Sequence, residues 1–524
     1  MRSIVVETMH GHIAGSESVN GVCIFKGVRY GESTEGIARF LPPQKPIPWQ
    51  GVRNALQLGP QCPQATTSDY VDNDASRFYA GAVEPQPYRM SEDCLFLNIW
   101  TPGIHDNTRR PVMVWCHGGG FEYGSGGADW YDGANLSLRG DVVVVTLNHR
   151  LNVFGFLHLA DFGSEKFRDA GNAGLLDIIG ALQWVRDNIE AFGGDPNNVT
   201  LFGSSGGACK ITALLAMPGA RGLFHKAILQ SGVVRQYQRV VGTAGDKKRV
   251  AAQLIEELLQ AKVETLDALQ KIPGDELLTA LRRVQRLLGD DFGMRCCSPV
   301  IDGKTLPVFP FDPVAPEVSA HIPLLIGTTA DESRLLHGAD AFSLDSTQLF
   351  ERLRYMLQID NDRINSLIDA YRTAYPDASA SDLFFSIASD HHFRTDALLQ
   401  IESKAQQNKA PVYAYRFDWP SPAADGKFRA AHGTELPFIF ENLDKAPGAI
   451  GTITAEKITL ANRISQAWVA FARYGNPNHS DIPTWKSYDQ KERSTMLIND
   501  EWQSVPTPKQ HLLSMLTELK SFEP

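Results

Sequence analysis

The sequence predicts an α/β fold with a central, mostly parallel sheet flanked by helices. Two apolar runs of strand length, residues 111–116 and 141–147, are typical of strands that are covered on both faces. Residues 172–190 carry apolar side chains at three- and four-residue spacing, which predicts a helix, and residues 198–202 predict the next strand. A second helix is expected over 208–217. Strands that alternate with helices in this way form a parallel sheet.

The rest of the chain fits one large domain over residues 1–524 with helical insertions. Short β-like runs punctuated by glycine and proline fill the N-terminal part, and strands resume at residues 324–326 and 412–416. The segments 235–295 and 340–410 are charged and rich in helical patterns. We expect them to be insertions that follow sheet strands and form a pocket wall or a lid.

Composition and charge exclude several function classes. The 524 residues carry 50 basic and 60 acidic side chains, a formal charge of −10, with no basic run suited to nucleic acid. No apolar run approaches the roughly 18–20 residues of a membrane helix. The N-terminus lacks the apolar core of a secretory signal, so we expect a cytoplasmic protein, or a secreted or periplasmic one if the chain is already processed. The seven cysteines show no CxxC spacing, which argues against a zinc site.

Two adjacent serines stand in Phe202-Gly-Ser-Ser-Gly-Gly207, between an expected strand and an expected helix. A nucleophile elbow needs glycine two residues before and two residues after the serine, because strand, turn and helix backbones crowd there. Ser205 has Gly203 and Gly207 at these offsets, whereas Ser204 would need glycine in place of Phe202. The spacing therefore predicts Ser205 as a catalytic nucleophile, although Gly-Ser-rich segments are often turns without chemistry.

A second glycine motif, His117-Gly-Gly-Gly-Phe121, follows directly on the strand over 111–116. Ligands bind at the carboxyl ends of strands in open α/β sheets, and glycines let backbone N–H groups approach a ligand closely. This motif is therefore interpreted as an oxyanion-hole loop rather than as a plain flexible loop. The backbone N–H of Gly206, next to the nucleophile, would supply a further donor.

A serine nucleophile needs a histidine base, and the base needs a carboxylate that orients it. In this type of fold the order along the chain is Ser, then Asp or Glu, then His. His432 stands out because it lies in a loop after the strand over 412–416. Asp331 and Glu332 follow a short apolar strand, and Asp390 is a third candidate, so spacing alone leaves the acid open.

Six further motifs are spread over nearly the whole chain: Phe25-Lys-Gly-Val-Arg-Tyr30, Arg39-Phe-Leu-Pro-Pro43, Ser91-Glu-Asp-Cys-Leu-Phe-Leu-Asn-Ile-Trp-Thr-Pro102, Asn148-His-Arg-Leu-Asn-Val-Phe-Gly-Phe156, Gly222-Leu-Phe-His-Lys-Ala-Ile-Leu-Gln-Ser-Gly232 and Phe471-Ala-Arg-Tyr-Gly-Asn-Pro-Asn478. With the serine and glycine motifs, this set resembles the type-B carboxylesterase family, the α/β-hydrolases that include carboxylesterases and cholinesterases. The resemblance implies the α/β-hydrolase fold and a serine esterase that hydrolyses small-molecule carboxylic esters without a metal or an organic cofactor.

The resemblance assigns roles that spacing leaves open. It implies Glu332 as the acid of the triad, with Asp331 in a structural role. It also implies that the backbone N–H groups of Gly119, Gly120 and Gly206 are the oxyanion donors.

The resemblance further bears on two cysteines and on one departure from the family's pattern. Cys62 and Cys94 match positions that the family often links by a disulfide, and a reducing cytoplasm would leave them as thiols. The residue before the nucleophile is usually glutamate in the family, whereas this chain has Ser204. Losing that buried charge is expected to stabilise the imidazolium less and to lower activity or shift its pH optimum.

The expected reaction is ester hydrolysis through a covalent acyl-enzyme. An amidase, a thioesterase or a carbamate hydrolase would use the same residues, and a non-catalytic cholinesterase-like binding module would typically lack one of them. Four aromatic residues follow the oxyanion loop, and we expect them to line an apolar pocket, with a place in the core as the alternative for each. They are Phe121, Tyr123, Trp130 and Tyr131.

Overall fold

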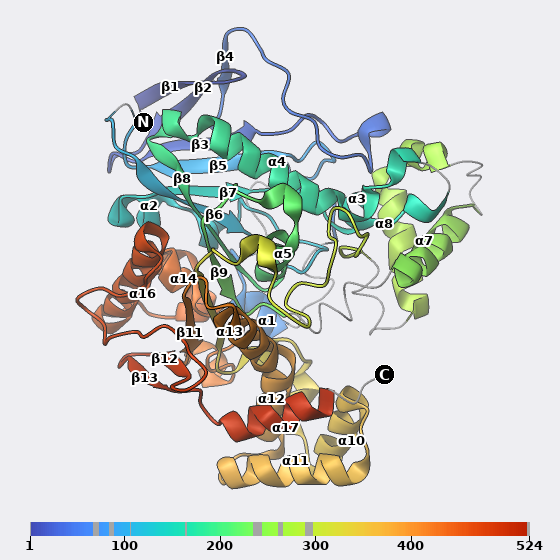
Figure 1. Ribbon diagram of the computed structural model, residues 1–524, viewed down its shortest axis with the longest axis vertical. Helices are drawn as coiled ribbons and strands as arrows, with labels where there is room; N and C mark the ends of the chain where they lie inside the picture. The colour runs from blue at the N-terminus through green and yellow to red at the C-terminus, as the bar shows by residue number, and fades with distance from the viewer. Residues whose placement is uncertain are drawn as a thin grey trace.

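The computed structural model describes residues 2–65, 73–82, 89–104, 106–162, 165–233, 244–259, 266–288 and 297–520. Its centre is a sheet to which thirteen strands contribute in this described part of the chain (Figure 1). The middle of the sheet is parallel, in the order β7, β6, β8, β9, β10, β11, β12, which confirms the predicted fold class. These strands are Val143–Leu147 (β7), Arg110–Cys116 (β6), Gly194–Ser204 (β8), Lys226–Gln230 (β9), Leu324–Thr329 (β10), Val412–Phe417 (β11) and Ser494–Ile498 (β12).

Antiparallel strands extend the sheet at both edges. On one side the strands of the N-terminal part join β7 through β5, and on the other side β13 pairs with β12. β4 lies off this path and pairs with β2. The strands that flank the parallel middle are Arg2–Thr8 (β1), Gly11–Glu17 (β2), Cys23–Arg29 (β3), Val52–Asn54 (β4), Phe96–Thr101 (β5) and Gln503–Pro506 (β13).

The apolar runs found in the sequence form the buried centre of the sheet, because every residue of β6 and β7 is buried. Side chains of a strand point alternately to its two faces. On β6, Val112 belongs to the core that includes α4 (Ala173–Asn188) and α5 (Gly206–Ala216), whereas Trp115 belongs to the core that includes α16 (Ala455–Tyr474). Helices thus cover both faces, as continuous apolar strands require.

Two boundaries near the serine motif differ from the prediction. β8 begins at Gly194, whereas the strand was expected to begin at residue 198, because Gly194 pairs with Arg110 of β6 and so extends the sheet. α5 begins at Gly206 rather than at residue 208. The helix therefore starts at the residue that follows Ser205.

Two groups of helices lie outside the sheet in Figure 1. α7 (Ala244–Leu259) and α8 (Gly274–Leu288) pack side by side and come from the segment 235–295. Residues 235–243, 260–265 and 289–295 of that segment, and Cys296, lie outside the described residues. In the described parts of the chain, no helix is both long and apolar enough to cross a membrane.

The second group comes from the segment 340–410 and from the C-terminal part of the chain. It has an apolar core of its own, to which α17 (Gln510–Lys520) contributes together with three helices of the segment. The helices of the segment are Ser346–Leu357 (α10), Asn361–Ala374 (α11), Ala380–Ser389 (α12) and Thr395–Gln407 (α13).

Candidate active site

Ser205 stands at the turn between β8 and α5, with φ of 57° and ψ of −124°. A non-glycine residue with positive φ is strained, and a nucleophile elbow imposes this strain on its serine. A Cβ atom would lie 2.7 Å from the carbonyl oxygen of Cys116 at Gly203, and 2.0 Å from it at Gly207. Both positions therefore require glycine. Ser204 is the last residue of β8 and its side chain is buried.

His432 and Glu332 meet at the edge of the sheet where Ser205 stands. β8, β10 and β11 run in the same direction, so their carboxyl ends share this edge. Glu332 lies shortly after β10, which ends at Thr329, and begins a short 3₁₀ helix, whereas His432 lies in the loop that follows β11. Both side chains are buried, and His432 Nδ1 lies 2.5 Å from Glu332 Oε2. This nitrogen–carboxylate contact leaves the other ring nitrogen available for proton transfer.

Two donors fix the Glu332 carboxylate from the other side. The hydroxyl of Ser231 donates to Oε1 at 2.6 Å, and the backbone N–H of Thr329 donates to the same oxygen at 2.7 Å. Because Oε1 is held in this way, Oε2 is presented to the imidazole. Ser231 belongs to the motif over residues 222–232, but its contact with the acid was not predicted from the sequence.

The other two carboxylates that spacing left open have different partners. Asp331 is 3.2 Å from Arg334 Nε. Asp390 accepts a hydrogen bond from the Tyr371 hydroxyl at 2.7 Å and forms an ion pair with Arg394. Of the three candidates, Glu332 is the one that contacts His432.

The charges around His432 favour its protonated form. Burial alone would lower the pKa of His432, but the negative charge and hydrogen bond of Glu332, with a contribution from Glu435, outweigh burial and leave the pKa raised. The Tyr79 hydroxyl donates to the carbonyl oxygen of His432 at 2.8 Å, and the ring of Phe393 lies 5.1 Å from the imidazole. These contacts hold the loop and the ring in position.

Glu435 is a second buried carboxylate beside the triad candidates, three residues after His432. Gln230 Nε2 donates to its Oε1 at 3.1 Å. Burial, followed by the charge of Glu332, raises the pKa of Glu435 to about 7. Gln230 is also the strand partner of Ser204 across β8 and β9. The additional buried carboxylate near His432 is therefore Glu435, from the same loop as His432, and not the residue at position 204.

The glycine loop lies against the first residue of α5. A Cβ atom on Gly206 would lie 2.4 Å from the backbone nitrogen of Gly120, so the loop and the helix start touch. Gly119 has φ of 82°, and a Cβ atom there would lie 2.2 Å from the carbonyl oxygen of Tyr123. The N–H groups of Glu122 and Tyr123 both donate to the carbonyl oxygen of Gly119 at 3.2 Å. The tight turn thus depends on glycine.

The prediction that Trp130 lines a pocket is wrong. Trp130 is fully buried, and its Nε1 donates to the carbonyl oxygen of Ala80 at 3.0 Å, so it is a core side chain. Tyr131 packs with its ring 4.9 Å from that of Trp115 in the same core. Phe121 is also a core residue, and its ring lies 5.1 Å from that of Phe156.

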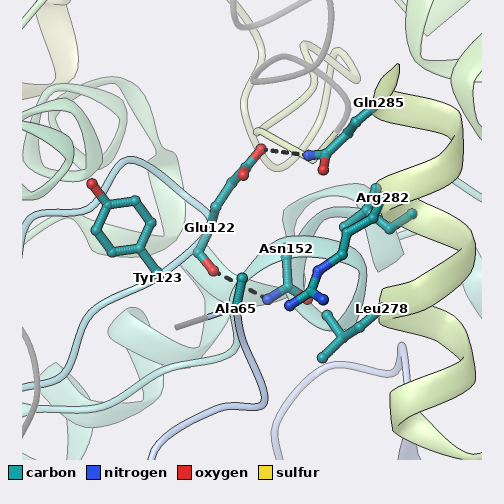
Figure 2. A pocket seen from close by; sticks show the side chains of 8 residues that line it. Ala65, Glu122, Tyr123, Asn152, Leu278, Arg282 and Gln285 are labelled. Carbon is teal, nitrogen blue, oxygen red and sulfur yellow. Dashed lines mark hydrogen bonds between the residues drawn. The ribbon is translucent and has the colours of Figure 1, made fainter. Parts of the chain in front are cut away.

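Tyr123 lines a small, partly open pocket, and most of the side chains that line this pocket are polar or charged. Figure 2 shows the residues after the glycine loop on one side of it and helix α8 on the other. Gln285 Nε2 of α8 donates to Glu122 Oε1 at 3.0 Å. A helix of the segment 235–295 therefore forms a wall beside this loop. The lining residues are Ala65, Glu122, Tyr123, Asn152, Leu278, Leu281, Arg282 and Gln285.

Cys62 and Cys94 are buried free thiols, so the disulfide that the resemblance implied is not formed in the structure. The sulfur of Cys62 accepts the backbone N–H of Leu151 at 3.2 Å. A hydrogen bond with Cys62, followed by burial, holds the pKa of the Cys94 thiol well above its ordinary value. A protonated, buried thiol is a poor starting point for oxidation. Within the described residues, no cluster of three or more His, Cys, Asp or Glu side chains could hold a metal ion.

Comparison with known proteins gives a consistent result. A model of the carboxylesterase family matches residues 2–515. Para-nitrobenzyl esterase of Bacillus subtilis is 37% identical over 502 residues, which cover 95% of each chain. Phenmedipham hydrolase of Pseudarthrobacter oxydans is 32% identical and 96% of each chain is covered. Among solved structures, the carboxylesterase EST55 of Geobacillus stearothermophilus has a TM-score of 0.83 at 34% identity and covers 98% of this chain and 99% of its own.

Proposed function

Because the chain belongs to the carboxylesterase family and is a carboxylic ester hydrolase, we propose that Ser205, His432 and Glu332 are its catalytic triad. The observation that carries this proposal is the 2.5 Å contact between His432 Nδ1 and Glu332 Oε2, at the sheet edge that also bears the strained Ser205. A Glu that accepts from Nδ1 fixes the tautomer in which Nε2 can take a proton from a serine hydroxyl.

The proposed reaction proceeds through an acyl-enzyme. His432 removes the proton from Ser205 as the serine oxygen attacks the ester carbonyl, and the resulting imidazolium is stabilised by Glu332. The imidazolium then protonates the departing alcohol. Water, activated by the same imidazole, releases the acid and restores the serine.

The proposed oxyanion donors are the backbone N–H groups of Gly119, Gly120 and Gly206. The close approach of Gly120 to Gly206 supports this assignment, because donors from the loop and from the start of α5 can then converge on one oxygen atom. Preorganised donors of this kind are worth about 10²- to 10³-fold in turnover each.

The name of the Bacillus subtilis relative gives the substrate class that we propose first. By its name that protein acts on para-nitrobenzyl esters, and we propose that this chain also hydrolyses benzyl-type esters. The 37% identity to that protein, over 95% of each chain, supports the proposal.

Turnover of a para-nitrobenzyl ester and of para-nitrophenyl acetate by wild type, Ser205→Ala and Ser204→Ala tests the assignment. Ser205→Ala should lose turnover by a factor of about 10⁴ or more. Ser204→Ala is the matched control and should remain active. Wild-type turnover in Ser205→Ala would sink the triad assignment.

A further inference from the structure

Lys210 is a fully buried lysine and the single charged residue of helix α5. Its Nζ donates a hydrogen bond of 2.9 Å to the carbonyl oxygen of His117. A buried amine is costly, because burial removes the hydration of its charge. An amine retained in such a position is a candidate for a functional role when a specific contact accounts for it.

The groups around Lys210 do not neutralise its charge. The titratable side chains that face it are Cys116, Cys209, His117 and His149, and the ring of Phe121 lies 6.0 Å from its Nζ. Burial lowers the pKa of Lys210 to about 7. Burial, followed by the charge of Lys210, also holds the pKa values of both histidines well below their usual value, so these rings are neutral. The amine donates an N–H to the carbonyl in either of its own protonation states.

The contact joins the two elements that carry the proposed oxyanion donors. Lys210 lies on α5, whose first residue is Gly206. His117 is the first residue of the loop that continues through Gly119 and Gly120. The hydrogen bond from Lys210, which is buried from solvent, therefore ties the start of the loop to the helix.

The far end of the loop is held by other groups. The N–H of Gly124 donates to Gln64 Oε1 at 2.6 Å, and the N–H of Asn152 donates to the carbonyl oxygen of Phe121 at 2.7 Å. With Lys210 at the start, the loop is fixed at both ends. Oxyanion donors act through preorganisation, so small displacements of the loop relative to Gly206 would weaken transition-state binding more than substrate binding.

We propose that Lys210 is a positioning residue for the oxyanion hole, which sets the distance between the donors of the glycine loop and the donor of α5. This inference rests on the proposed function of the glycines. It concerns a residue that touches neither the substrate nor the reacting atoms. Its signature is therefore a loss of turnover without a matching loss of substrate binding.

Lys210→Met removes the N–H donor and keeps most of the volume of the side chain. Chain position 404 offers a matched control, because Lys404 is also buried and donates to the backbone carbonyls of Ser319 and Ala320 at 3.1 and 2.7 Å. Lys404→Met thus removes a buried lysine that also donates to backbone carbonyls, but to carbonyls that lie outside the glycine loop and α5. We expect Lys210→Met to lower kcat by about tenfold or more and to leave KM within about twofold, whereas Lys404→Met leaves both unchanged.

A second readout is the affinity for a trifluoromethyl ketone, whose serine adduct places an oxyanion in the hole. Its inhibition constant should rise in Lys210→Met by the same factor as kcat/KM falls, because both report binding of the oxyanion. Equal kcat in wild type and Lys210→Met, an unchanged inhibition constant, or an equal loss in Lys404→Met would overturn the proposal.

Two further controls separate the role of Lys210 from a folding defect and from a wrong triad assignment. If Lys210→Met does not fold, Lys210→Gln, whose amide has a shorter reach, should show the same loss of kcat at unchanged KM. If neither variant folds, Lys210 is a folding residue and the proposal is overturned. Ser205→Ala separates failure of the Lys210 proposal from failure of the proposed function. An active Ser205→Ala protein refutes the triad. An inactive Ser205→Ala protein together with a fully active Lys210→Met protein refutes only the role of Lys210.

Discussion

Replacing Glu435 by glutamine is a sharp test of the electrostatics around His432. Glu435 is 1% exposed, and burial, followed by the charge of Glu332, raises its pKa to about 7. Glutamine has nearly the same shape, cannot ionise, and can still accept the hydrogen bond from Gln230 through its carbonyl oxygen. The substitution therefore removes a buried charge that forms in wild type as the pH rises.

The free energy involved follows from the pKa. The ordinary value for this carboxyl is 4.5, and in the fold it is about 7, so the folded state binds the proton more tightly than the unfolded chain does. Each factor of ten in proton affinity corresponds to about 1.4 kcal/mol. The protonated Glu435 carboxyl contributes about 3 kcal/mol to the free energy of unfolding. This contribution is complete below pH 4.5 and is lost as the pH rises through 7.

Denaturant unfolding of both proteins at pH 5 and pH 8 measures this contribution. The stability of Glu435→Gln relative to wild type should increase by about 2 to 3 kcal/mol between these pH values. Glu501→Gln is a control, because Glu501 is exposed and has no burial penalty to lose. If Glu435→Gln and wild type change in parallel with pH, Glu435 does not ionise at a raised pKa and the electrostatic reasoning is refuted.

Three further predictions concern catalysis. In a pH–rate profile, the acid limb of kcat/KM should lie above pH 6.5, because the pKa of His432 is raised from this value and only the neutral imidazole accepts a proton. Glu435→Gln should move this limb to lower pH, since it removes a negative charge that raises the pKa of His432. A shift of the limb to higher pH would contradict this prediction. Glu332→Gln should lower kcat by roughly 10³- to 10⁴-fold in steady-state assays, and a loss of less than tenfold would exclude this residue as the acid. Gly119→Ala should lower kcat about 10²-fold with the fold retained by circular dichroism, because its Cβ atom would lie 2.2 Å from the Tyr123 carbonyl oxygen; wild-type kcat would show that the loop supplies no donor.

Much of the fold could be predicted from the sequence because its strongest signals are local. A strand buried on both faces must be apolar throughout, and the runs at 111–116 and 141–147 became β6 and β7. The identity of the nucleophile candidate was equally local, since crowding at Gly203 and Gly207 is a property of the turn itself. Boundaries were less predictable: β8 gained residues from Gly194 on because of a pairing with a distant strand.

The parts of the site that the sequence left open depend on contacts between distant segments. Spacing could not choose Glu332 over its neighbours, because the choice depends on which carboxylate meets a histidine 100 residues later. Trp130 was assigned to a pocket because it follows the loop, but the direction of its side chain is set by tertiary packing in the core. Lys210 and Glu435 carried a signal that was overlooked: Lys210 is the one Lys, Arg, Asp or Glu in residues 206–216, and Glu435 is the one in residues 430–440.

The central claim, that Ser205 is the nucleophile, is tested most directly by covalent labelling with a fluorophosphonate followed by mass spectrometry of the digested protein. Ser205 and Ser204 are neighbours, but only Ser205 stands at the strained turn before α5. We predict one label per chain, located on Ser205, loss of activity in step with labelling, normal labelling of Ser204→Ala and no labelling of Ser205→Ala. A label on Ser204 or elsewhere, or full activity after stoichiometric modification of Ser205, would contradict the claim.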